Sequence, residues 1–367
     1  MKFTTEMAVK SSNPLKRMIK PLVSPAVYDF WVRKLVSNAA WETPLATVVE
    51  RHVEARDSVT LLLRPNGHFD GFIPGQHVNV TIAVEGIRHT RSYSLTDVPR
   101  KDGLLSITVK RVGGGKVSTE LCQHARVGDV LELGQAFGEL TAPADYQGNW
   151  LFLAAGSGIT PIISLIRSLS LSTLKQNVTL LYWARTRADL CFFQELRELS
   201  AREPRFHLHF VLTREHEMLP NDLQGRPSLA LFEQLVSDMT EQRAYACGPA
   251  GFVDNVRELI AERVGFFASE AFTPVTTNVV DLGKVTVTLQ RSQQQVEVAT
   301  DKPLLAALED VGVTPASGCR MGICNTCACE KTAGVSEDLL TGEMDTDVNS
   351  ALRICVSAAR SDLTLDL

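Results

Sequence analysis

Three cysteines near the end of the chain, Cys319, Cys324 and Cys327, follow one another in C-x4-C-x2-C spacing, and Cys355 lies further along. Four thiolates in this arrangement are the ligand set of a plant-type [2Fe–2S] cluster. Gly322 in the intervening loop lets backbone N–H groups turn toward the sulfurs. A zinc site or a group of free thiols are the alternatives, but zinc favours C-x2-C pairs, and this run contains only one. The spacing therefore predicts an iron–sulfur cluster, a centre that moves single electrons.

The other four cysteines are expected to have different roles. Cys247 lies far from the cluster run, in a glycine-rich turn. Cys329 is two residues past Cys327, outside the C-x4-C-x2-C run, and is expected to be a spectator. Cys122 and Cys191 fit buried positions on helix faces. We predict that none of the four is a cluster ligand.

A second group of residues could bind a flat ring and a phosphate. Arg91, Tyr93 and Ser94 lie in one predicted strand, where they could pair a phosphate, stack on a ring and donate a hydrogen bond. The glycine-rich stretch Gly113-Gly-Gly-Lys-Val-Ser-Thr119 follows the next strand. Its glycines would allow the backbone to approach a phosphate closely, and Ser118 could cap a following helix. A flexible loop is the alternative interpretation.

Two further glycine turns fit a dinucleotide. Gly156-Ser-Gly-Ile-Thr-Pro161 follows a buried strand, with Thr160 suited to the N-cap and Pro161 to the first helical position. Cys247-Gly-Pro-Ala-Gly251 ends another strand. Turns of this kind at one edge of a parallel sheet can hold phosphates, although ordinary strand-to-helix turns are the alternative. The full G-x-G-x-x-G fingerprint is missing.

The elements that must position these residues change in character along the chain. From about Thr47 to Thr141, short alternating strands separated by Gly, Pro and Asn predict an antiparallel barrel. From Asn149, buried strands alternate with helical stretches, which predicts a parallel α/β domain. After a linker, a strand pair leads to a helix opening at Pro303 and then to the cysteine loop. The expected fold class is therefore multidomain, α/β plus all-β.

Composition and charge narrow the setting. Five of the eight cysteines lie within 319–355, so they indicate a metal site in a reducing, cytosolic compartment rather than a disulfide framework. No run of 18 apolar residues is present, and the first ten residues lack a signal-peptide core. The net charge of −5 does not indicate nucleic-acid binding.

The charge is unevenly distributed. Residues 1–40 hold seven Lys or Arg and two acids, whereas residues 283–367 hold seven and twelve. The basic start could rest on an anionic membrane surface or pack on the protein's own body, and we favour the second. The acidic end could steer a basic partner toward the cluster or simply be a solvated face. Its acids are Glu337, Asp338, Glu343, Asp345 and Asp347.

Taken together and in this order, the motifs resemble the ferredoxin–NADP reductase superfamily, in its branch of oxygenase reductases with a C-terminal plant-type ferredoxin domain. The resemblance implies an N-terminal extension (1–44), an FAD-binding barrel (45–146), an NAD(P)-binding α/β domain (147–270), a linker (271–282) and a β-grasp [2Fe–2S] domain (283–367). It also implies FAD rather than FMN.

The resemblance also implies site residues. Arg91 would pair the flavin pyrophosphate, Tyr93 would stack on the isoalloxazine, and Ser94 would lie near the hydride-accepting nitrogen. The remaining cofactor contacts would come from Gly114, Gly115, Ser118, Gly156, Gly158, Thr160, Gly248, Pro249 and Phe272. Ser94, Cys247 and Glu270 would shape hydride transfer. Arg185 and Arg187 follow a strand where a 2′-phosphate would lie, so we favour NADPH over NADH.

The resemblance suggests a path from NAD(P)H through FAD and the cluster to an oxygen-activating iron enzyme. We expect a membrane-bound di-iron fatty-acyl desaturase, with the protein in the cytoplasm or peripheral to the inner membrane face. The reductase component of a ring-hydroxylating oxygenase or monooxygenase is the alternative. A redox-sensing regulatory module is an alternative of another class, and a reductase that releases free flavin is a weaker one.

Overall fold

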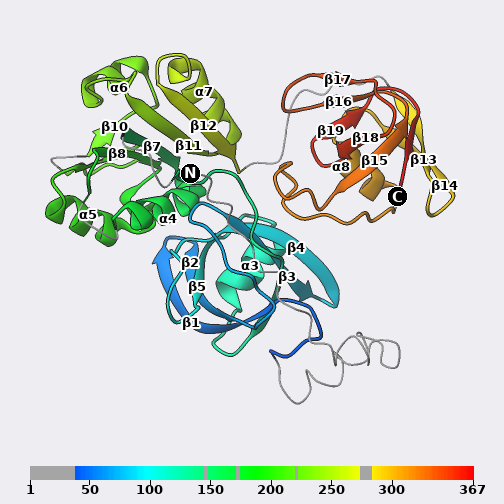
Figure 1. Cartoon of the computed structure of the whole chain (residues 1–367), viewed down its shortest axis with the longest axis horizontal. Coiled ribbons are helices and arrows are strands. Elements are labelled where there is room, and N and C mark those ends of the chain that lie inside the picture. Colours follow the sequence, from blue (N-terminus) through cyan, green and yellow to red (C-terminus); the bar gives the residue numbers. More distant parts are fainter. Residues whose placement is uncertain (1–37, 144–147, 171–173, 220–221, 273–282) are drawn as a thin grey trace, which may run out of the picture.

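The computed structural model describes residues 38–143, 148–170, 174–219, 222–272 and 283–367. These residues form three units that follow one another along the chain (Figure 1). An antiparallel sheet comes first, a parallel sheet flanked by helices second, and a pair of smaller sheets third. The expected fold class is confirmed.

The first unit is a six-stranded antiparallel barrel. Its strands are β1 (Leu45–Ala55), β2 (Ser58–Pro65), β3 (His77–Val84), β4 (Ile87–Ser94), β5 (Leu105–Lys110) and β6 (Val130–Leu133). They run in the order β4-β3-β6-β1-β2-β5, and a bridge between Leu95 and Ile107 closes the sheet. Alternate residues such as Val78 and Val80 point into the apolar interior. Helix α3 (Lys116–Gln123) packs on this core through Val117 and Leu121.

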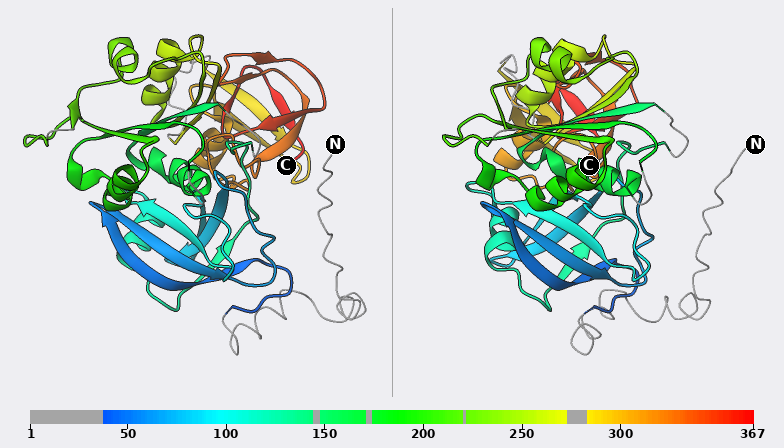
Figure 2. Two further views of the ribbon diagram at one scale, coloured as in Figure 1. Left: turned by 60° about the vertical axis from the view of Figure 1, so that its left-hand side comes forward. Right: turned by 90° about the vertical axis from the view of Figure 1, so that its left-hand side faces the viewer.

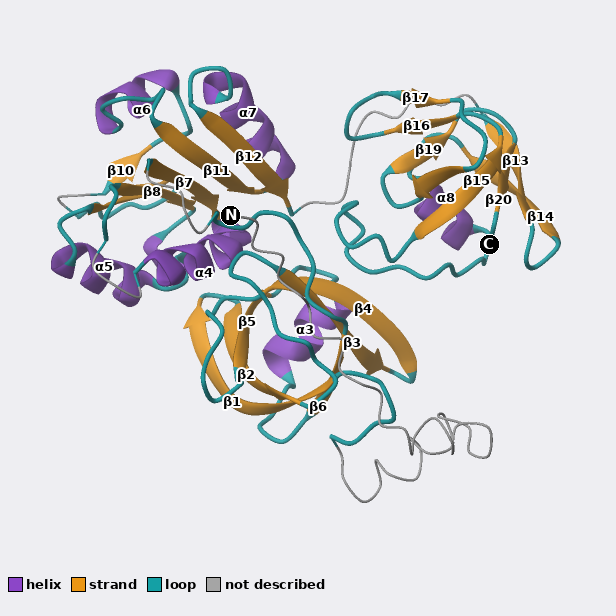
Figure 3. Cartoon of the chain, in the orientation of Figure 1, coloured by secondary structure: helices purple, strands orange, loops and turns teal. Residues whose placement is uncertain are grey.

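The second unit is a parallel six-stranded sheet in the order β10-β9-β8-β7-β11-β12. Its strands are β7 (Asn149–Ala155), β8 (Val178–Ala184), β9 (Phe206–Leu212), β10 (Leu223–Gln224), β11 (Gln242–Gly248) and β12 (Phe266–Ala271). Helices α4 (Ile159–Leu169) and α5 (Phe193–Arg202) cover one face, while α6 (Leu229–Leu235) and α7 (Ala250–Ile260) cover the other (Figure 3). The central strands are buried on both faces, as parallel strands require.

The third unit carries the cysteine loop. Its five-stranded sheet contains β13 (Lys284–Leu289), β14 (Gln294–Ala299), β15 (Ala328–Ala333), β18 (Ser350–Arg353) and β20 (Leu363–Leu365). A three-stranded sheet adds β16 (Ser336–Asp338), β17 (Met344–Asp345) and β19 (Ser357–Ala359). Helix α8 (Leu304–Asp310) begins after Pro303, as predicted, and packs on the larger sheet. The long loop between α8 and β15 holds three of the four predicted cluster ligands.

Local structure differs from the sequence-based expectation at several points. Helix α4 begins at Ile159 after a turn of 3-10 helix, so Thr160 lies inside the helix and is not its N-cap. Ser118 likewise lies inside α3, whose N-cap is Gly115. Cys191 precedes α5 and does not lie on its face, although it is buried. The sequence did not predict strands β1, β10, β12 or β15 to β19 individually.

The N-terminal extension and the linker lie largely outside the described residues. The described end of the extension packs on the barrel, since Trp41 is buried and the His68 ring nitrogen Nε2 is 3.0 Å from the Ala40 carbonyl oxygen. The predicted basic arm lies outside the described range. Among the described residues, no helix has both the length and the apolar character needed to cross a bilayer.

Candidate functional site

The predicted flavin residues lie on β4 and sit at the centre of the molecule. Burial raises the pKa of the Tyr93 hydroxyl above its usual value and lowers that of the Arg91 guanidinium. Ser94 is buried and accepts a hydrogen bond from the Thr160 hydroxyl at 3.0 Å. This bond joins the barrel strand to the first turn of α4, so the structure brings the predicted flavin and nicotinamide residues together.

The glycine-rich loop has the shape that a phosphate cradle needs. Gly114 has φ +74°, which favours glycine, and the space beside it is open. A Cβ on Gly115 would lie 2.6 Å from the Ser118 Oγ. Ser118 folds back over this glycine and accepts a hydrogen bond from the Val112 N–H at 3.2 Å. The first N–H groups of α3 and the Ser118 hydroxyl proton therefore remain available to an anion.

The two nucleotide turns meet at the point where the parallel sheet reverses its strand order. From β7 the chain builds outward through β8 and β9, and it then returns to the other side of β7 with β11. A Cβ on Gly158 would lie 2.0 Å from the Cys247 carbonyl oxygen, so only glycine fits. A Cβ on Gly248 would lie 2.9 Å from the Ala155 Cβ. Ligands of open α/β sheets bind at such switch points.

Cys247 and Glu270 are neighbours across β11 and β12. Cys247 is fully buried, and its pKa is raised well above that of a free thiol, first by burial and then by the nearby Glu270 carboxylate. The Phe272 N–H donates to the Gly248 carbonyl at 2.8 Å, which brings this ring to the same edge. Pro249 is the N-cap residue of α7. Cys247 and Glu270, two of the three predicted catalytic residues, thus lie at the same end of the parallel sheet as the predicted nucleotide turns.

His77 is a site residue that sequence reasoning missed. It opens β3 opposite Ser94, is 2% exposed, and places its Nε2 3.2 Å from the Glu270 Oε2. Its ring lies edge-on to Phe272 and stacks with Phe137. This contact geometry is poor for a hydrogen bond, although the distance suits an ion pair if the ring is protonated. The sequence signal that could have indicated it is a histidine directly before the predicted strand 78–84, close to the predicted flavin strand.

The two predicted phosphate-binding arginines differ in the structure. Arg187 is already paired, since its guanidinium donates to the Asp222 carboxylate and lies 3.9 Å from the Glu215 Oε2. Arg185 is exposed at the end of β8, and its carbonyl accepts the Arg214 N–H at 2.7 Å. The exposed Arg214 therefore lies beside Arg185 and was not predicted.

The four predicted cluster ligands converge. The N–H groups of Met321, Ile323 and Cys324 each lie 3.3 Å from the Cys319 Sγ. Hydrogen bonds with Cys324 and Cys355, aided by backbone N–H groups, lower the pKa of Cys319 to about 2. Cys327 is likewise hydrogen-bonded to Cys355. A set of sulfurs that already share hydrogen bonds, inside a loop whose amides stabilise negative charge, fits a thiolate-bound cluster.

Each iron of a [2Fe–2S] cluster takes two protein thiolates, so the four converging thiols would supply the ligands of both irons. Cys329 lies on β15 and packs against the domain core, and burial raises its pKa to about 12.

The cluster loop lies against the barrel. The Asn79 side-chain Nδ2 donates to the Thr326 Oγ1 at 3.1 Å, and the Ser92 hydroxyl donates to the Asn79 Oδ1. Asn79 and His77 are two residues apart on β3, so both point to the same side of the strand. One contacts the cluster loop and the other contacts Glu270. In the turned views the third unit lies above the barrel, in line with this contact (Figure 2).

The predicted acidic face is partly neutralised within its own domain. Glu337 pairs with Arg360, Asp338 with Arg353, and Asp345 with the buried Lys331. For Glu343 and Asp347, no ion pair with another described residue is seen. Three of the five acids thus have a structural partner.

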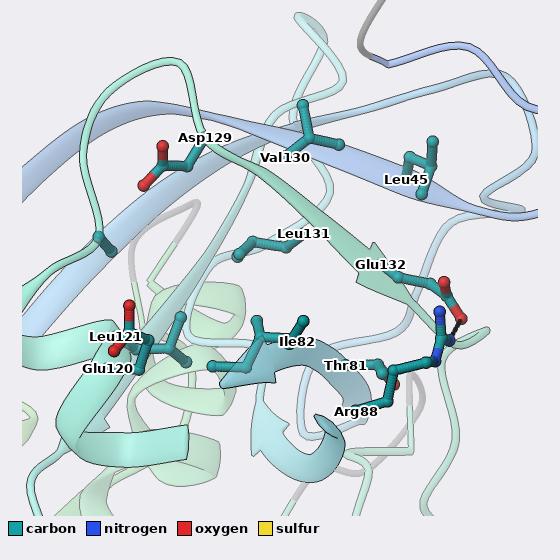
Figure 4. Close-up of a pocket in the computed structure, with 12 residues that line it drawn as sticks. Leu45, Thr81, Ile82, Arg88, Glu120, Leu121, Asp129, Val130, Leu131 and Glu132 are labelled. Carbon is teal, nitrogen blue, oxygen red and sulfur yellow. Dashed lines mark hydrogen bonds and ion pairs between the residues drawn. The ribbon is translucent and has the colours of Figure 1, made fainter. Parts of the chain in front are cut away.

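A separate pocket of about 410 Å³ opens between β3, β6 and α3 (Figure 4). Its lining is mixed, with Leu131 and Ile82 beside an ion pair of 2.6 Å between Arg88 and Glu132. None of the predicted cofactor residues lines it. The candidate site is therefore defined by converging strand ends and loops, and this hollow of the barrel lies outside it.

A parallel sheet with a nucleotide-type switch point and a set of four converging thiols both contact strand β3 of the barrel. Together they define an electron-transfer reductase with three domains. Comparison with known protein families gives the same three domains. Residues 46–141 match the family model of an oxidoreductase FAD-binding domain, residues 152–258 that of an oxidoreductase NAD-binding domain, and residues 287–360 that of a 2Fe-2S iron-sulfur cluster binding domain.

Over 364 residues the chain is 34% identical to an NADPH oxidoreductase of Mycobacterium tuberculosis, with 96% of this chain and 92% of that protein covered. Over 316 residues it is 32% identical to the ferredoxin reductase component of a 3-ketosteroid-9-alpha-monooxygenase of the same species, covering 80% and 85%. Among solved structures, phthalate dioxygenase reductase is similar with a TM-score of 0.59 and 26% identity, covering 88% of this chain and 97% of that one.

The chain belongs to the ferredoxin–NADP reductase family, in the group with a C-terminal [2Fe–2S] ferredoxin domain. It is an NAD(P)H oxidoreductase whose cofactors are FAD and the [2Fe–2S] cluster. When bound, FAD takes up a hydride and the cluster carries electrons singly.

Proposed function

We propose that this chain is the reductase component of an oxygenase and delivers electrons from NADPH, through FAD and the cluster, to a terminal oxygen-activating iron protein. The carrying observation is the convergence on β3, where His77 meets Glu270 of the nucleotide domain and Asn79 meets Thr326 of the cluster loop. This arrangement brings the proposed hydride-transfer site and the cluster loop to the same barrel strand, as a chain that passes electrons from one to the other requires. Relatives named as oxygenase reductases support this class of acceptor.

The residue roles follow from position. Arg91 and the Gly114–Ser118 loop would bind the flavin pyrophosphate, and Tyr93 would stack on the ring. Ser94, held by Thr160, would place its hydroxyl at the reacting edge. Cys247 and Glu270 would lie beside the nicotinamide, with Phe272 covering the flavin until the nicotinamide enters. The Gly158 turn would receive the nucleotide phosphates.

For the nucleotide, we assign NADPH and the 2′-phosphate to Arg185, with the neighbouring Arg214 as a second cation. Arg187 is already committed to Asp222 and remains a structural residue in this proposal. The Arg185→Ala variant is expected to lower kcat/KM for NADPH about tenfold while leaving kcat/KM for NADH unchanged, because one charge-assisted contact is lost. An equal loss with both nucleotides would contradict this assignment.

The function is tested with the purified holoprotein, NADPH and cytochrome c as a one-electron acceptor. Sustained cytochrome c reduction is expected, together with bleaching of flavin and cluster absorbance in an anaerobic NADPH titration. A redox sensor has no need for turnover, so reduction that stopped after one equivalent would contradict the reductase proposal.

The acceptor is tested by reconstitution. Hydroxylated product with a purified oxygenase component, and none with membranes that contain a fatty-acyl desaturase, is the expected result. The reverse result would establish the desaturase hypothesis, which none of the relatives named above supports.

A further inference from the structure

Positive charges gather where the cluster loop meets β4. Arg91 and His89 lie two residues apart on this strand, and Lys116 lies at the start of α3. Burial lowers the pKa of both β4 side chains, and the positive charge of Arg320, from the cluster loop of the third domain, lowers them further. The Glu309 carboxylate acts on Arg91 in the opposite direction and offsets part of this positive charge, and an anion lying among these groups would offset more of it.

Arg320 is held in place from behind. It directly follows the ligand Cys319, has φ +60°, and makes two bonds from its terminal nitrogens to the Glu309 carboxylate of α8, at 2.8 and 2.5 Å. A guanidinium carries five N–H groups, so three remain. One of them, Nε–H, is buried and has no partner among the described residues, and the Nε2 of His89 is in the same state.

Unpaired buried nitrogens are expensive, and each needs an explanation. Here they lie beside Arg91, the residue assigned to the flavin pyrophosphate, and near the Gly114–Ser118 loop. The hydrogen bond from Asn79 to Thr326 holds the cluster loop on the same pair of barrel strands, and a Cβ on Gly318 would lie 3.1 Å from the Asn79 Nδ2. The loop thus approaches the barrel closely on either side of Cys319.

We propose that Arg320 binds the pyrophosphate of FAD across the domain interface, so that the ferredoxin domain completes the flavin site. The Glu309 pair would orient the guanidinium, and its free Nε edge would donate to a phosphate oxygen. Binding of FAD and docking of the ferredoxin domain would then stabilise each other to the same extent, because linkage between two binding events is reciprocal. The inference rests on FAD binding, a part of the proposed function, and not on the identity of the acceptor.

The test measures FAD binding to the full chain with its cluster intact. FAD affinity is obtained from the free flavin fluorescence released on dilution, and the cluster is monitored by its absorbance. Arg320→Gln is expected to weaken FAD binding about tenfold, the effect of losing one charge-assisted contact. Arg320→Lys keeps the charge but loses the forked guanidinium, so its FAD affinity is expected to lie between those of wild type and Arg320→Gln.

Arg291 provides a matched control. It lies in the same domain and makes the same kind of two-bond pair, with Asp366. Its side chain is exposed, and Arg291 follows β13 and does not lie in the cluster loop. Arg291→Gln should leave FAD affinity unchanged. Riboflavin, which has no phosphate, should bind deflavinated Arg320→Gln and wild type equally well.

The outcomes separate the two levels of the proposal. FAD affinity of Arg320→Gln within twofold of wild type, or an equal loss with riboflavin, would overturn the role of Arg320 alone. Failure of the wild-type chain to bind FAD at all would overturn the proposed function instead.

Discussion

At the scale of residues, what surrounds each sulfur separates the eight cysteines. Cys324 lies in the loop where amides and neighbouring thiols point at sulfur, whereas Cys329 is held in β15 against apolar side chains. Both have raised pKa values, Cys324 through its hydrogen bond to Cys319 and Cys329 through burial, so the pKa alone does not distinguish ligand from spectator. Position in the loop does.

Substitution of each of these two cysteines by serine is therefore expected to give opposite results. Cys324→Ser is expected to lose the cluster, because an iron would be left with one thiolate, whereas Cys329→Ser should keep it. Visible absorbance and iron content of the purified variants measure the difference. Cluster loss in Cys329→Ser with retention in Cys324→Ser would reverse the ligand assignment.

The Cys247 thiol yields a prediction about pH. Burial and Glu270 raise its pKa above the ordinary value of 9.0, so the folded chain holds this proton more tightly than the unfolded chain does. Its contribution to stability is therefore constant below pH 9.0 and is lost as pH rises above it.

At the position beside the nicotinamide that we propose for it, the same pKa shift predicts that Cys247 stays a neutral thiol. Flavin reduction by NADPH, followed by stopped-flow absorbance, should show no thiol titration between about pH 6 and 9. Cys247→Ser should have the same pH profile as wild type, even if its rate differs. A step in the wild-type profile that disappears in Cys247→Ser would show that the thiolate takes part.

The site residues that could be predicted from sequence are those whose partners are close along the chain. Cys319, Cys324 and Cys327 share one loop, and Arg91, Tyr93 and Ser94 share one strand, so spacing alone brings each set together. His77 and Asn79 make their contacts with other domains. Such contacts span up to 247 positions along the chain, and no local pattern encodes them.

At the scale of elements, the α/β switch point depends on one close approach. The predicted N-cap at Thr160 was wrong because a turn of 3-10 helix, Gly156–Gly158, precedes α4 and starts the helix earlier. At the end of that turn Gly158 passes the Cys247 carbonyl so closely that a Cβ would clash with it. The strand β12 was missed because its residues are half-exposed at the sheet edge and lack a clear alternation.

This approach predicts the effect of a single methyl group. Gly158→Ala would place the new carbon 2.0 Å from the Cys247 carbonyl oxygen, so β7 and β11 must move apart at the nucleotide edge. The KM for NADPH is expected to rise at least about tenfold, since a shift near 1 Å misplaces a bound ligand, while FAD is retained. Steady-state kinetics and the flavin spectrum measure the two effects.

Gly251 is the control for this change. It lies in the first turn of α7, with no protein atom within 4 Å of a Cβ, so Gly251→Ala should leave β7 and β11 in place and stabilise the helix by about 0.5–1 kcal/mol. A KM that rises equally in both variants would show that the turn is sensitive to any methyl group, and the argument from close approach would fail.

At the scale of the whole molecule, β3 links the three domains. Its inward residues Val78 and Val80 build the barrel core, and its outward residues His77 and Asn79 contact the nucleotide domain and the cluster loop. The three-domain order could be predicted from the order of the motifs. The arrangement in space could not, because it depends on a few polar contacts between surfaces that are far apart in sequence.

The hydrogen bond from Asn79 to Thr326 predicts a separation between two electron-transfer steps. It is exposed to solvent, so its loss should cost about 1 kcal/mol and shift docking of the cluster loop about fivefold. Thr326→Val, which keeps the shape of the side chain and removes the hydroxyl, should therefore slow cluster reduction by up to about fivefold. Flavin reduction by NADPH does not involve the cluster loop and should stay unchanged. Anaerobic stopped-flow absorbance resolves the two steps in one trace.

Thr332→Val is the matched control, because its hydroxyl bonds only within the ferredoxin domain, to the Thr364 carbonyl at 3.3 Å. It should leave both steps at their wild-type rates. Asn79→Ala should slow cluster reduction at least as much as Thr326→Val, because it also removes the bond from Ser92, and the double variant should be no slower than Asn79→Ala. If the effects of Asn79→Ala and Thr326→Val instead add, each residue acts through a different contact, and β3 does not couple the cluster loop to the flavin strand through this bond.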